Sequence, residues 1–271
     1  MNALLKIIAY LGFVVVAGSL LAIPLYEAGQ WAIETDLIPA LKKYRFPKYL
    51  NRGVLIAALI GLWPFLKSLG LNGMGALGLQ QNLSAKKDLL VGIGLGVAGL
   101  SMVSIGLVWT GRLDILPEIS PIWFLSAAAT AVAVALIEEF FFRGALFGVL
   151  LRQFSPRVAI TVLSILFAVL HFIKPHASVK HWQGEIHWWS GFDVLSYSFW
   201  QFKEPQLLVG GLLTLFLVGV VLAYATLKTK SLFLAIGIHG GWVFVLRLVQ
   251  MGTKRQTPPD WLVGKPLITG V

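Results

Sequence analysis

The chain has 271 residues, of which 57% are hydrophobic and only 13% are charged, whereas about 25% of residues are charged in an ordinary soluble domain. Its apolar stretches are about 20 residues long and lack the alternation of membrane β-strands, so we predict an all-α, polytopic integral membrane helical bundle. The net charge of +10 comes from basic residues in short loops, which is typical of membrane topology. We therefore expect a lipid bilayer and no nucleic acid as partner. The absence of cysteine excludes disulfide and thiolate chemistry.

The apolar stretches predict about seven transmembrane helices in a single membrane domain that takes in residues 1–271. We expect the first stretch to be a retained span, because it is long for the apolar core of a signal peptide. The predicted spans, with approximate ends, are Ala3–Leu25, Gly53–Leu69, Asp88–Thr110, Pro121–Leu151, Pro156–Ile173, Gln206–Leu227 and Ser231–Gln250.

Glycines recur along the third predicted span, at positions 92, 94, 96 and 99. Small residues at such spacing let the backbones of two membrane helices approach closely. The sequence therefore predicts that this span packs tightly against another helix.

Three ionisable side chains lie inside the fourth predicted span, in the segment Ile137–Arg143. Each charged group costs roughly 2.5–3.5 kcal/mol at the centre of a membrane helix, so such groups normally face a protein interior and serve a function. Glu139 and Arg143 are four residues apart and therefore neighbours on one helical face. Glu138 points about 100° away from Glu139 and lacks a helical partner. A structural ion pair beside one protonated glutamate is the alternative interpretation.

Two histidines in later spans lie at a comparable depth. At a rise of 1.5 Å per residue, Glu138 and His171 lie ~20 Å, and His239 ~12 Å, from the same membrane face. We therefore predict that the three side chains meet. A carboxylate with two imidazoles in a buried pocket can activate water, either directly as a general base or through a divalent metal such as zinc held by the same three groups.

The order of these residues resembles the CPBP family of intramembrane proteases. That family includes the CAAX prenyl endopeptidases and bacterial proteins linked to bacteriocin processing and self-immunity. The resemblance covers about residues 121–250, leaving N-terminal spans in residues 1–110 and a polar tail in residues 251–271. The matching motifs are E-E-x-x-x-R (Glu138, Glu139, Arg143), F-x-x-x-H (Phe167, His171) and a histidine in a later span (His239).

The resemblance implies an endopeptidase in which Glu138, assisted by His171, activates water for attack on a peptide bond. Glu139 would join Glu138, His171 and His239 in the catalytic set and would also shape the site, together with Arg143 and Phe167. His239 would stabilise the oxyanion. The implied substrate is a peptide or membrane-anchored protein, prenylated in the CAAX case, and the implied location is the cell membrane. A glutamate base requires no cofactor.

One position departs from the family pattern, which usually continues H-x-x-x-N or H-x-x-x-D. The fourth residue after His239 is Val243, and the loss of one oxyanion donor lowers a rate by about 10²–10³. Arg247 is a candidate substitute on the same helical side. The departure keeps open a weakly active or inactive immunity or scaffold protein of the same fold. A proton-coupled transporter is the third alternative, although we find no paired helix breaks of the transporter kind.

Overall fold

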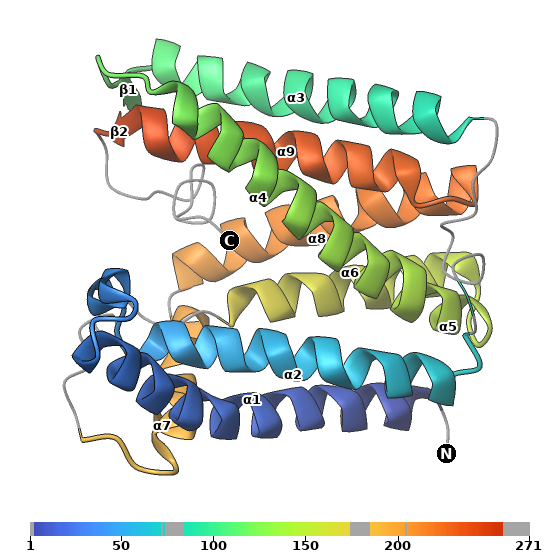
Figure 1. The fold of residues 1–271 in the computed structure, drawn as a ribbon. Helices are drawn as coiled ribbons and strands as arrows, with labels where there is room; N and C mark the ends of the chain where they lie inside the picture. The colour runs from blue at the N-terminus through green and yellow to red at the C-terminus, as the bar shows by residue number, and fades with distance from the viewer. Residues whose placement is uncertain (1–2, 72, 74–83, 174–184, 204, 257–271) are drawn as a thin grey trace. The chain divides into compact units, whose positions relative to one another are not determined.

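A computed structural model describes residues 3–71, 73, 84–173, 185–203 and 205–256 (Figure 1). The predicted all-α fold class is confirmed. Within the described residues, six helical segments are long and apolar enough to cross a membrane, and α6 is a shorter apolar helix of 17 residues. The long segments are α1 (Ala3–Glu34), α2 (Phe46–Ser68), α3 (Ala85–Trp109), the continuous segment Pro121–Leu151, α8 (Pro205–Thr229) and α9 (Phe233–Gly252).

The chain divides into two compact units, one formed by residues 1–72 and 172–204 and the other by residues 73–171 and 205–271. The first unit contains α1, α2 and α7 (Ser190–Ser196), with 3-10 helices at Pro39–Lys43 and Tyr197–Lys203. The second contains α3, α4 (Pro121–Glu139), α5 (Phe147–Leu151), α6 (Pro156–Phe172), α8 and α9. The single domain expected from the sequence stays a prediction.

In the first unit, α1 and α2 pack closely at Gly18 and Gly53. A Cβ atom on Gly18 would clash with Val54, and one on Gly53 would clash with the Gly18 carbonyl. The core beside this contact consists of Ala22, Phe46, Leu50 and Val194. The helix α1 continues to Glu34 instead of ending near Leu25. Pro24 does not interrupt it, because membrane helices tolerate the loss of one backbone donor.

In the second unit, the predicted glycine packing joins α3 to α9. Gly92 and Gly96 contact the α9 backbone near Gly237 and Gly241, so that neither helix has room for a Cβ atom there. Gly94 meets open space, because it lies on another face of α3. This contact fixes the helix that carries His239.

Two further features of the second unit were not predicted. The fourth span is not one regular helix, because a π-helical segment at Phe140–Leu146 separates α4 from α5. A short antiparallel pair, β1 (Leu113–Ile115) and β2 (Thr253–Arg255), joins the chain after α3 to the chain after α9. The predicted polar tail, residues 251–271, begins with the end of α9 and β2, and residues 257–271 lie outside the described ones.

The packing of α3 on α9 predicts that the same substitution destabilises the protein at one glycine of α3 and not at another. Gly96→Val should destabilise the protein by about 1–3 kcal/mol, because the added side chain overpacks a filled contact. Gly94→Val, the matched control, should leave stability nearly unchanged, because its Cβ meets nothing. Thermal unfolding of the detergent-purified variants measures both. Equal melting temperatures for the two variants would contradict the contact.

Candidate active site

The two glutamates occupy the last turn of α4, directly before the π-helical segment Phe140–Leu146. A π-helical turn holds an extra residue, which rotates the side chains that follow it, and such turns are frequent at functional sites. Arg143 lies within this segment and still forms an ion pair one turn back with Glu139. The sequence therefore predicted the pair correctly and missed the helix irregularity around it.

Glu139 is the fully buried centre of a polar cluster. Its Oε1 accepts a hydrogen bond from Arg143 Nη1 at 2.8 Å and another from His239 Nδ1 at 2.8 Å. Arg143, only 2% exposed, also donates from Nη2 to the Gly219 carbonyl at 3.4 Å. The cluster thus ties α4 and the π-helical segment to α8 and α9.

Glu138 lies beside both histidines, as the matched depths predicted. Its Oε2 is 3.2 Å from His171 Nε2 and 3.8 Å from His239 Nε2, and its side chain is 18% exposed. Among the described residues, no group forms a hydrogen bond of normal geometry with this oxygen. Glu138 therefore presents one carboxylate oxygen to the Nε2 atoms of both imidazoles.

The hydrogen bonds at Nδ1 orient both imidazoles. His171 Nδ1 lies 2.8 Å from the Phe167 carbonyl, and His239 Nδ1 lies 2.8 Å from the Glu139 carboxylate. A carbonyl and an ionised carboxylate only accept hydrogen bonds, so each Nδ1 must carry the proton. Each ring then presents Nε2 to Glu138, the kind of orientation that outer partners give to functional histidines.

Aromatic rings form one wall of the site. The ring centroids of Phe167 and His171 are 4.0 Å apart. The Cζ atom of Arg143 lies 4.6 Å from the Phe167 ring centroid. Phe142 packs edge-to-face on Phe167 at 5.0 Å. Phe167 therefore lies beside His171 and Arg143, and its shaping role stays a prediction. Phe142 is also buried beside the site.

The departure from the family motif lies in a buried position. Val243 is 5% exposed, one turn after His239 in α9, and offers no polar atom. Arg247, the candidate substitute, donates from Nη1 to Gln250 at 3.0 Å. This hydrogen bond joins two residues of the same helix, α9.

Metal binding by Glu138, His171 and His239 was the alternative to a glutamate base. Within the described part of the chain, no group of three or more His, Asp or Glu side chains has an arrangement that would hold a metal ion. The use of a metal stays a prediction.

The carbonyl of Gly219 is the site group that sequence reasoning missed. Gly219 lies against Ser164 of α6, where a Cβ atom would clash with the Ser164 backbone. The sequence of an apolar helix does not indicate which backbone carbonyl will accept a hydrogen bond from a distant side chain. The contact between Arg143 and the Gly219 carbonyl is therefore identified only from the structure.

Comparison with known proteins agrees with the motif resemblance. Residues 120–245 match the family model described as "Type II CAAX prenyl endopeptidase Rce1-like". No curated protein and no solved structure matches the chain. The matched segment contains the whole cluster from Glu138 to His239. Six candidate spans lie in the part of the chain that the structure describes, so the chain is a multi-pass integral membrane protein.

The two glutamates should respond differently to loss of charge. Glu139→Gln leaves Arg143 buried without a counter-charge, so it should destabilise the protein by about 3–5 kcal/mol and lower the folded yield. Glu138→Gln, the matched control on the neighbouring residue, should fold like the parent. Yield and melting temperature in detergent measure the effect.

Adding Arg143→Met to Glu139→Gln should restore part of the lost stability, because it removes the uncompensated charge. Normal folding of Glu139→Gln alone would disprove the structural role of the pair.

Proposed function

Because residues 120–245 match the model of the type II CAAX prenyl endopeptidase Rce1-like family, we propose that this chain is an intramembrane endopeptidase that uses Glu138 to activate water. The observation that carries the proposal is the position of the Glu138 carboxylate, within 3.8 Å of two imidazole Nε2 atoms. A carboxylate and two imidazoles this close can bind one water molecule between them, and a general base must lie within hydrogen-bond reach of the proton that it takes.

In the proposed reaction, Glu138 takes one proton from water while the oxygen attacks the carbonyl carbon of the scissile peptide bond. His171, held through Nδ1, orients the same water from Nε2. The carbonyl oxygen becomes an oxyanion, and collapse of the tetrahedral intermediate breaks the C–N bond. Glu138 then gives its proton to the leaving amine, so that water supplies both new hydrogens and the oxygen of the new carboxylate.

His239 is the proposed oxyanion donor. Because its Nδ1–H is bound to Glu139, Nε2 can donate only when the ring carries a second proton. The Glu139 carboxylate holds Nδ1 of His239, and Arg143 fixes the carboxylate. We therefore assign Glu139 and Arg143 to positioning of the His239 ring.

We propose a membrane-anchored, prenylated substrate that is cleaved near its C-terminus. An apolar cavity supports the prenyl part of this proposal. This cavity of about 470 Å³ lies among α3, α4 and α9, with walls that include Ala131, Ala135, Leu136 and Gly240. Leu136 shares α4 with Glu138, and Gly240 shares α9 with His239. A hydrocarbon chain in this cavity would anchor the attached substrate to the helices that carry the proposed base and the proposed oxyanion donor. We place the protein in the cell membrane.

A non-catalytic immunity or scaffold role is the second candidate. The buried Val243 favours it, because the family's usual side-chain donor is missing.

Replacing the proposed base tests between these functions. Glu138→Gln keeps the size and hydrogen bonding of the side chain but cannot accept the proton, so cleavage should fall to background. Glu118→Gln, an exposed acid after α3, is the matched control and should cleave like the parent. The measurement compares C-terminal peptides, proteome-wide, from cells that express each form. Unchanged cleavage by Glu138→Gln would reject the base, and no cleavage by the parent would favour the scaffold.

A substitution at position 243 can restore the missing oxyanion donor. Val243→Asn should raise the rate of cleavage by up to about 10² if the new amide reaches the oxyanion. Val243→Leu, which adds no donor, should not. Rates on a prenylated peptide in detergent measure the difference; a slower, well-folded Val243→Asn variant would show that this position does not face the reacting carbonyl.

A further inference from the structure

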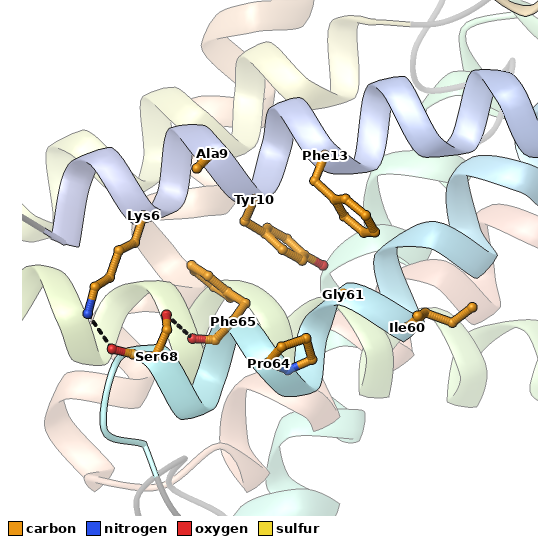
Figure 2. A pocket seen from close by; sticks show the side chains of 9 residues that line it. All are labelled: Lys6, Ala9, Tyr10, Phe13, Ile60, Gly61, Pro64, Phe65 and Ser68. Atoms are coloured by element: carbon orange, nitrogen blue, oxygen red, sulfur yellow. Dashed lines mark hydrogen bonds between the residues drawn. The ribbon is translucent and has the colours of Figure 1, made fainter. Parts of the chain in front are cut away.

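A second pocket lies in the first unit, far from the proposed chemistry in sequence. It is a groove of about 270 Å³ between the start of α1 and the end of α2 (Figure 2). Its floor is an aromatic stack, with the rings of Tyr10 and Phe65 4.4 Å apart. The Tyr10 hydroxyl donates to the Ala58 carbonyl at 2.8 Å, so the polar end of that ring is satisfied within the unit.

Small and ring-constrained residues keep the groove open. Ala9 of α1 and Gly61 and Pro64 of α2 line it. A Cβ atom on Gly61 would clash with Phe13, so the glycine lets this ring lie flat against α2. The result is an apolar channel along two membrane helices.

The mouth of the groove is cationic. Figure 2 shows Lys6 reaching from α1 to the Ser68 carbonyl at the end of α2, to which its ammonium donates a hydrogen bond. An ammonium has three protons, so two remain for another acceptor. Lys67 is exposed and lies seven residues after Ile60, a lining residue, and hence on the same helical face. None of the described residues that line the groove is acidic.

Along its length the groove changes from charged to apolar, as a phospholipid does from its head group to its acyl chains. Lys6 lies at the start of α1 and Phe13 about 10 Å deeper, by helical rise. A charged mouth at the helix ends, where lysines reach the membrane surface, is followed by an apolar channel toward the bilayer interior. A phosphate fits the mouth and a hydrocarbon chain fits the channel.

We propose that this groove binds one anionic phospholipid, with its phosphate at Lys6 and Lys67 and an acyl chain along Ala9, Tyr10 and Phe13. The two cations and the lack of lining carboxylates select an anionic head over a zwitterionic one. The site lies within the first unit and does not depend on the proposed protease activity.

Native mass spectrometry of the detergent-purified full chain, titrated with phosphatidylglycerol or phosphatidylcholine, tests the site. The parent should bind one phosphatidylglycerol in preference to phosphatidylcholine. Lys6→Gln and Lys67→Gln should each weaken binding about fivefold, since one basic residue near a membrane surface contributes about 1 kcal/mol toward anionic lipid. The matched control Lys86→Gln/Lys87→Gln removes two exposed charges from α3 and should leave this binding unchanged.

A second pair of variants tests the channel without changing charge. Ala9→Leu should block the bound lipid by filling the groove, whereas Gly12→Leu, where an added Cβ meets nothing, should not. Inorganic phosphate should not compete, because the acyl chain supplies part of the affinity. Equal binding of both lipids, equal loss in the Lys86/Lys87 control, unchanged binding by Ala9→Leu, or displacement by phosphate would each overturn the proposal.

Discussion

A single carboxylate oxygen, Oε1 of Glu139, accepts hydrogen bonds from both Arg143 and His239. A buried charge with one partner removed is strongly destabilising, whereas a fully paired one is tolerated. The shared oxygen therefore does two things at once: it neutralises the buried guanidinium and it turns the His239 ring so that Nε2 faces Glu138. The proposed role of Glu138 therefore depends on the two hydrogen bonds to Glu139 Oε1, because they hold His239 in this orientation.

The helices around the cluster set the distances within it. The glycine contacts between α3 and α9 bring the helix of His239 into place without side chains between the backbones. The π-helical segment follows Glu139 immediately, and the Gly219 carbonyl of α8 accepts a hydrogen bond from Arg143 within the same cluster. The apolar cavity that we assign to the substrate's hydrocarbon chain is bounded by the same α3, α4 and α9, so one packing arrangement serves both the base and the proposed substrate site.

Sequence reasoning reached the parts of this site that follow from spacing and depth. The pair Glu139 and Arg143 follows from a four-residue interval, and the meeting of Glu138 with His171 and His239 follows from helical rise. The bond from His239 to Glu139 could not be predicted, because it depends on the rotation of α9 about its own axis. The π-helical segment could not be predicted for a similar reason. Apart from one glycine, Phe140–Leu146 has no residue that disfavours a regular helix, so tertiary packing determines the helix type there.

The orientation of the two imidazoles is the claim on which the account depends most directly, and their tautomers can be measured. Solid-state ¹⁵N spectra of the histidine-labelled protein in lipid, assigned with His171→Asn and His239→Asn, report which ring nitrogen carries a proton. The account predicts a proton on Nδ1 of both His171 and His239, donated to the Phe167 carbonyl and to Glu139. Either ring with its only proton on Nε2 would contradict it.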